Sequence, residues 1–133
     1  MDRLRVVVDA GLSPGAVAAQ AVHAVVAFGV EHPEGFKAWR TGSSTIVILA
    51  ADEAQLAVLR DKAARAGLDV ASFHEPDLDD ALTAIAVGPS GEARRLTRGL
   101  RLAVRWRARR GSNPCVSGFK IRCLNQLGDR RRT

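Results

Sequence analysis

The sequence predicts an α/β fold, a three-layer α/β/α sandwich around a four-stranded mixed β-sheet. Short apolar runs of strand type alternate along the chain with longer helical segments, and two of these runs follow each other closely enough to form a hairpin. The length of 133 residues allows one modest hydrophobic core and not two. We therefore expect a single folded domain in which helices cover both faces of the sheet.

The first elements carry clear start and stop signals. The run Leu4–Asp9 is short and rich in valine, which predicts a buried strand. Ser13 and Pro14 mark a helix start, because serine offers a side-chain acceptor at the cap and proline fixes φ in the first turn. This helix is expected to run to about Val30, where "EHPEG" interrupts it, and a short amphipathic helix then ends at Gly42.

The later elements continue the alternation. Residues 44–50 predict a second buried strand, and Asp52 caps a surface helix that Gly67 ends. The apolar stripe of this helix consists of Leu56, Leu59 and Ala63. Residues 68–73 and 82–87 predict two further strands joined by the acidic connection "HEPDLDD", and a last helix is expected to begin at Glu92.

Charge divides the chain into two parts. Residues 1–103 carry 11 Lys and Arg against 13 Asp and Glu, whereas residues 104–133 carry 9 against 1, so all the excess basicity lies in the last part. We expect a domain over residues 1–103 and a basic, disordered tail over residues 104–133. The tail holds Cys115 and Cys123, which lack the further ligands of a zinc site and are expected to be free thiols.

No secretory signal and no membrane span are predicted, so a cytoplasmic protein is expected. The start of the chain lacks a basic region followed by a long apolar one. The longest apolar stretch, Ser13 to Val30, is interrupted by Gln20 and His23.

The helix from residue 14 raises the question of why these two polar side chains lie three positions apart. On a wheel of about 100° per residue, one broad apolar side is predicted to pack on the sheet. It is formed by Val17, Ala21, Val25 and Phe28. A narrow line beside it is formed by Ala16, Gln20, His23 and Ala27. The small alanines in this line would allow another molecule to approach the two polar groups closely; the alternative is an ordinary half-exposed helix surface.

The stretch "VVVDAGLSPGAVAAQAVHA" resembles the N-terminal signature of the peptidyl-tRNA hydrolase 2 family. The resemblance continues through "STIVILA", "TAIAVGP" and "LTRGLRL" and covers about residues 4–102, as in a divergent member of bacterial type. It implies hydrolysis of the ester that links a peptide to the 3′ ribose of tRNA, without a metal or other cofactor. The implied partner is peptidyl-tRNA, with no membrane, and a homodimer is a candidate assembly.

The resemblance also implies a set of catalytic residues. His23 suits the role of base or donor, since imidazole titrates near neutral pH, and Gln20 can orient a carbonyl group or a water molecule. Thr83, expected on the same strand face as Ile85 and Val87, corresponds to a family threonine and could donate to the oxyanion. Glu75 best matches the family aspartate by chain position, with Asp77 second.

Two departures from the family pattern leave an alternative function open. Ala16 stands where the family usually has a lysine, and "FHEPDLDD" replaces a longer Asp-Ala-Gly-x-Thr-Gln type segment together with its threonine. The chain is thus either a peptidyl-tRNA hydrolase or a catalytically weak or inactive relative that acts as a tRNA-binding or protein-binding module. Retention of Gln20, His23 and Thr83 favours the first, and Ala16 favours the second.

Basic residues of the domain are expected to bind tRNA phosphates. They are Arg94, Arg95, Arg98 and Arg101 after the last strand, and Lys37 and Arg40 beside Trp39. The alternative for the arginines is a solvated helix face. Trp39 itself either stacks on a terminal base or caps the core. The tail is either a basic arm for RNA or the translated antisense strand of a tRNA gene, and no function is assigned to residues 112–133.

Overall fold

The computed structural model describes residues 2–104 of the chain. The tail predicted over residues 104–133, with Cys115 and Cys123, lies outside the described residues apart from Val104.

A four-stranded mixed sheet forms the centre of the domain, with strand order β2-β1-β4-β3. The strands are β1 (Leu4–Asp9), β2 (Ile46–Ala51), β3 (Val70–Glu75) and β4 (Ala81–Val87). The central strand β1 pairs parallel with β2 and antiparallel with β4, and β4 pairs antiparallel with β3. The parallel pair requires a crossover, which the first two helices supply.

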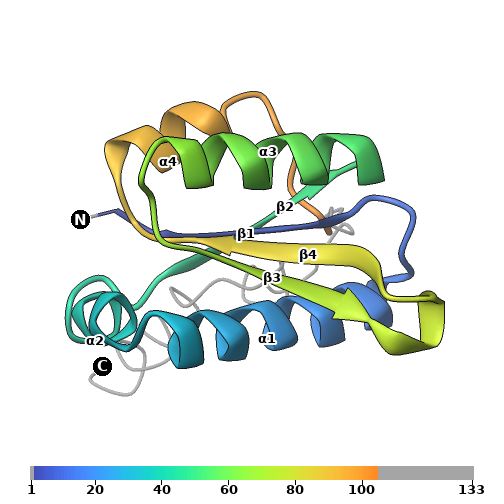
Figure 1. The fold of residues 1–133 in the computed structure, drawn as a ribbon, viewed down its shortest axis with the longest axis horizontal. Helices are drawn as coiled ribbons and strands as arrows, with labels where there is room; N and C mark the ends of the chain where they lie inside the picture. Colours follow the sequence, from blue (N-terminus) through green and yellow to red (C-terminus); the bar gives the residue numbers. More distant parts are fainter. Residues whose placement is uncertain (1, 105–133) are drawn as a thin grey trace, which may run out of the picture. The chain divides into compact units, whose positions relative to one another are not determined.

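Helices cover both faces of this sheet (Figure 1). On one face lie α1 (Pro14–Glu31) and α2 (Pro33–Thr41), and on the other lie α3 (Glu53–Arg65) and α4 (Gly91–Leu96). A short 3₁₀ turn, η1 (Pro76–Leu78), connects β3 to β4. The α/β/α sandwich predicted from the sequence is confirmed.

The helix starts follow from the capping residues that the sequence shows. The Ser13 hydroxyl accepts the Ala16 N–H at 3.3 Å, and Pro14 occupies the first turn of α1. Asp52 and Gln55 form a capping box at α3, in which the Asp52 carboxylate accepts the Gln55 N–H at 2.8 Å. Each cap satisfies N–H groups that have no partner inside the helix.

The buried face of α1 differs from the predicted one by a small rotation. Its buried residues are Val17, Gln20, Ala21, Ala24 and Phe28. Val25, predicted to pack on the sheet, is only half-buried, whereas Gln20 turns inward and His23 remains exposed. By length and composition α1 could span a bilayer, a property that it shares with the core helices of soluble proteins. In this fold its buried face packs on β3 and β4.

A β-bulge in β4 decides which way Thr83 points. Phe73 of β3 lies opposite Ala84 and His74 lies opposite Leu82, so Thr83 is one extra residue in β4. The Thr83 hydroxyl therefore faces α1, where it bonds Gln20, while Ile85 and Val87 pack in the core that α3 covers. The prediction that Thr83 shares a face with Ile85 and Val87 was wrong, because strict alternation breaks at the extra residue.

The outer edge of β2 is covered by the chain that follows α4. Leu102 pairs with Leu49 in an isolated antiparallel bridge. The Ala50 N–H donates to the Arg101 carbonyl at 3.0 Å, and the Ala103 N–H donates to the Ile48 carbonyl at 3.0 Å. Residues 101–103 thus act as a short cover strand, while β3 forms the other edge of the sheet.

Candidate active site

A chain of side-chain hydrogen bonds links α1 to the two strands of the β3–β4 hairpin. The Thr83 hydroxyl donates to Gln20 Oε1 at 2.7 Å, and Gln20 Nε2 donates to Glu75 Oε2 at 2.6 Å. Gln20 is 7% exposed and Thr83 is 1% exposed. Because both ends of the Gln20 amide are held, its orientation is fixed: the oxygen points to Thr83 and the nitrogen to Glu75.

Glu75 is held as a carboxylate in this arrangement. Its pKa lies below the ordinary value of 4.5, chiefly because Gln20 donates a hydrogen bond to it. The Asp77 backbone N–H, 3.3 Å from Glu75 Oε1, lowers the pKa further. Desolvation raises it by less than this, and the nearby His23 ring adds the smallest lowering effect. Glu75 therefore carries its negative charge throughout the neutral pH range.

His23 lies one turn after Gln20 on α1 and stacks on Phe73 of β3. The two ring centroids are 4.3 Å apart and the ring planes differ by 8°. Phe73 is half-buried and supports one face of the imidazole, while His23 is exposed. Phe73 was not among the residues identified from the sequence. A signal was present, however, because Phe73 lies two positions before Glu75 and therefore on the same face of β3.

The structure thus brings together all four residues predicted as catalytic, at the end of the sheet where β3 ends and β4 begins. Gln20 and His23 come from α1, Glu75 from β3 and Thr83 from the bulge of β4. Ala16 lies one turn before Gln20 and is half-buried. Its methyl group supplies no charge at the position where the family pattern expects a lysine.

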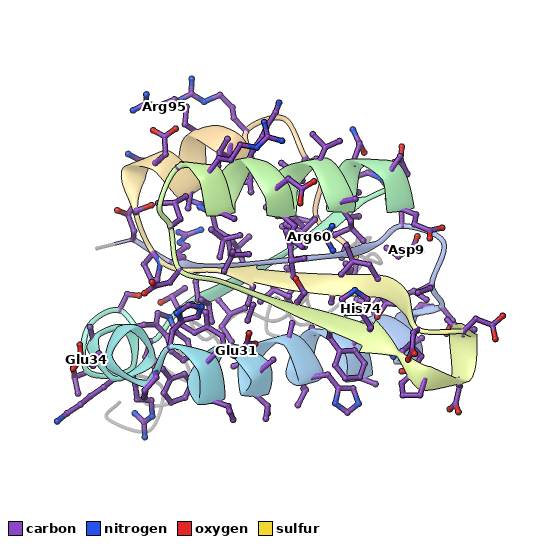
Figure 2. The ribbon with its side chains drawn as sticks, in the orientation of Figure 1. Asp9, Glu31, Glu34, Arg60, His74 and Arg95 are labelled. Carbon is purple, nitrogen blue, oxygen red and sulfur yellow. The ribbon has the colours of Figure 1, made fainter. Side chains whose placement is uncertain are left out.

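The six basic residues predicted to contact tRNA are all exposed. Lys37 and Arg40 are on α2; Arg94 and Arg95 are on α4; Arg98 and Arg101 follow α4. In Figure 1, α2 and α4 lie at the left end of the sheet and the β3–β4 connection at the right. Arg95 projects outward from α4, on the sheet face opposite α1 (Figure 2), and its guanidinium lies 3.4 Å from Glu92.

A hollow of about 450 Å³ opens at the same left end of the sheet, and it contains no member of the candidate catalytic set. Residues of α2 and of the loop before α4 line it, among them Trp39 and Ser90. Trp39 is only 8% exposed, and its Nε1 donates to the Thr45 carbonyl at 2.9 Å. The indole ring therefore caps the core, the second of the two roles predicted for it.

Comparison with known proteins places the chain in a family. A solved structure of a protein of unknown function from Agrobacterium tumefaciens strain C58 superposes with a TM-score of 0.49 at 12% identity, covering 75% of this chain and 96% of that one. A search of curated proteins found no match. The family model described as peptidyl-tRNA hydrolase PTH2 matches residues 3–103, which is most of the chain. The chain belongs to the PTH2 family of peptidyl-tRNA hydrolases.

Proposed function

We propose that this protein is a peptidyl-tRNA hydrolase that cleaves the ester between a peptide and the 3′ ribose of tRNA with water. The observation that carries the proposal is the Gln20 amide, fixed by Thr83 and Glu75 next to the exposed imidazole of His23. Family membership supplies the substrate class. A polar group oriented on both sides in a largely apolar helix is the kind of preorganised donor that ester hydrolysis requires.

The proton acceptor in this scheme is His23. Water attacks the carbonyl carbon of the ester while His23 takes a proton from the water, giving a tetrahedral intermediate. The bond from this carbon to the ribose oxygen then breaks, and the imidazolium returns the proton to that oxygen. The products are a peptide with a free carboxyl group and tRNA with a free 3′ hydroxyl. Glu75 suits this role less, because the lowering of its pKa makes it a weaker base.

Gln20 is the proposed donor to the oxyanion. One N–H of its amide bonds Glu75, which leaves the second N–H to donate to the carbonyl oxygen of the ester. Thr83 was expected to donate to the oxyanion, but its hydroxyl is buried and donates its hydrogen bond to Gln20 Oε1. Thr83 is therefore proposed as a positioning residue. The Glu75 carboxylate both orients Gln20 and balances the charge that His23 gains during the reaction.

Binding of the tRNA body is proposed for the exposed cations of α2 and α4. These two helices lie at the opposite end of the sheet from the β3–β4 connection (Figure 1), where their cations could contact phosphates several nucleotides away from the ester. The domain carries a net charge of −2 over residues 1–103, so these local cations and not the overall charge would provide the attraction. The substrate arises in translation, which makes the cytoplasm the proposed location.

The direct test is release of labelled peptide from an N-acylated aminoacyl-tRNA. We expect His23→Ala to lower kcat by about 10²- to 10⁴-fold, the usual effect of losing a general base. The matched control is His74→Ala, because His74 is also an exposed histidine, placed on β3 outside the hydrogen-bonded set. Wild-type protein that binds the tRNA without releasing peptide would refute the hydrolase and leave a tRNA-binding module.

A further inference from the structure

We propose that His23 and Phe73 together form the stacking surface for the terminal nucleobase of the tRNA. This inference rests on the proposed function and specifies how its substrate is held. Phe73 supports one face of the imidazole, with 4.3 Å between the ring centroids and 8° between the planes. Since His23 is exposed, the opposite face of its ring is available to a planar ligand. The pair is thus a stack of two aromatic rings with one face open to a ligand.

The position of this stacked pair matches the position that the terminal base must take. His23 is one helical turn from Gln20, and Phe73 is on the same face of β3 as Glu75. The reacting ester is attached to the ribose of the last nucleotide. When its carbonyl oxygen contacts Gln20, the base of the same nucleotide must lie within one nucleotide's reach of that amide, and the His23 ring lies there.

Stacking and proton transfer use different parts of the imidazole. A base covers the face of the ring, whereas the two nitrogens lie in the ring plane and stay accessible from the edge. A base above His23 would also fix the ring between two planar groups and so orient the nitrogen that receives the proton. The same side chain can therefore bind the substrate and take part in the reaction.

The surface fits a nucleobase better than an aliphatic side chain of the peptide. Near-parallel aromatic rings gain most from another flat, polarisable ring, and base stacking on aromatic side chains tolerates any base. Trp39, the other candidate from the sequence, is buried and bonds Thr45. Stacking on the terminal base is therefore proposed for His23 and Phe73 instead of Trp39, and these two residues come together only in the folded chain.

The experiment uses two acceptor-stem minihelices that carry the same N-acylated aminoacyl ester. One ends in adenosine, and the other ends in a ribose without a base. We expect Phe73→Leu, which keeps apolar volume but removes the ring that supports His23, to raise KM about fivefold or more on the first substrate. On the abasic substrate, wild type and Phe73→Leu should share one KM. Phe73→Trp keeps an aromatic face and should behave as wild type on both.

Several outcomes would overturn the inference. An equal rise of KM on both substrates would mean that Phe73 only packs against α1, and no rise on either would mean that the support of His23 by Phe73 does not contribute to binding of the base. A rise of KM that follows the peptide side chain instead of the terminal base would assign the surface to the peptide. Wild-type behaviour of Phe73→Trp, checked together with the unfolding midpoint of each variant, separates loss of the ring from loss of the fold.

A binding measurement separates this inference from the proposed function. An uncharged minihelix with 2-aminopurine at its 3′ end should lose fluorescence on binding to wild type and Phe73→Trp, because stacking quenches this base. It should lose less on binding to Phe73→Leu, in which His23 lacks its supporting ring. Quenching without any ester hydrolysis would support the stacking surface and refute the hydrolase. Hydrolysis without quenching would refute the stacking surface and leave the hydrolase standing.

Discussion

Substitution of Thr83 by valine tests the hydrogen-bond chain at its most buried point. Valine has nearly the shape of threonine, so the change replaces the hydroxyl with a methyl group and leaves packing almost unaltered. Thr83 is 1% exposed and Gln20 is 7% exposed, so water does not easily replace the lost donor. In the variant, Gln20 Oε1 loses the 2.7 Å bond and is left without this partner inside the protein.

The expected cost follows from leaving a buried acceptor unsatisfied. A neutral hydrogen bond contributes about 1 kcal/mol to stability, whereas an orphaned buried partner costs about 1–3 kcal/mol. We expect Thr83→Val to lower the free energy of unfolding by about 1–3 kcal/mol, the cost of an orphaned buried partner. We also expect a lower kcat, because the Gln20 amide would no longer be held at its oxygen end.

The assay is urea unfolding followed by circular dichroism, with Thr97→Val as the matched control. Thr97 is also a buried threonine, 5% exposed, and its hydroxyl donates to the Ala93 carbonyl at 2.9 Å. That carbonyl keeps a second donor, the Thr97 backbone N–H at 3.1 Å. The control therefore removes a buried hydroxyl without orphaning its acceptor, and it should cost less than Thr83→Val.

The double variant Thr83→Val with Gln20→Leu completes the test. Once the Gln20 acceptor is gone, the second substitution should be nearly neutral, which gives a coupling energy of about 0.5–3 kcal/mol between the two positions. Equal costs for Thr83→Val and Thr97→Val, or additive costs in the double variant, would refute the reasoning that Thr83 acts through Gln20.

Three further predictions concern the charges of the site and of the proposed tRNA surface. Glu75→Gln should be less stable than wild type at neutral pH. Urea unfolding at decreasing pH should show this difference shrink below pH 4.5, the ordinary pKa of the group, as wild-type Glu75 takes up a proton; the lowered pKa fixes this sign, and a constant difference would contradict it. Ala16→Lys should raise kcat about tenfold or more by placing a cation beside the developing oxyanion, whereas Ala18→Lys, on the exposed side of α1, should not; equal effects would contradict a specific role. Arg94→Ala should reduce the slope of log affinity for tRNA against log salt by about one, while Arg65→Ala on α3 leaves it unchanged; an unchanged slope in both would remove α4 from the tRNA surface.

Local sequence signals were sufficient to predict most of the fold, because the capping residues and apolar runs that define each element lie within it or next to it. Ser13 and Asp52 cap their helices as predicted, since capping depends on residues within one turn. The apolar runs became strands within a few residues of their predicted bounds. Element boundaries shifted where neighbouring strands extend the pairing, as at β3, which continues to Glu75 instead of ending at Phe73.

The details of the site depended on contacts between distant parts of the chain. Gln20 turns inward because it forms hydrogen bonds with Thr83 and Glu75. These partners lie 63 and 55 positions away in the sequence, so a helical wheel of α1 cannot show them. The bulge that turns Thr83 toward α1 is set by the pairing of β4 with β3, so period-two alternation assigned it the wrong face. The stack of His23 on Phe73 joins residues that the sequence placed in separate elements, which is why Phe73 was missed.

The cover strand of residues 101–103 also bears on which edges of the sheet are open to another chain. An uncovered strand edge presents unpaired N–H and C=O groups that can template the addition of another chain. The bonds from Ala50 and Ala103 occupy those groups on β2. A chain that stopped at residue 100 would keep every strand, every helix and every proposed catalytic residue, and yet it would expose a hydrophobic ribbon edge. Its first failure would then be self-association and not loss of chemistry.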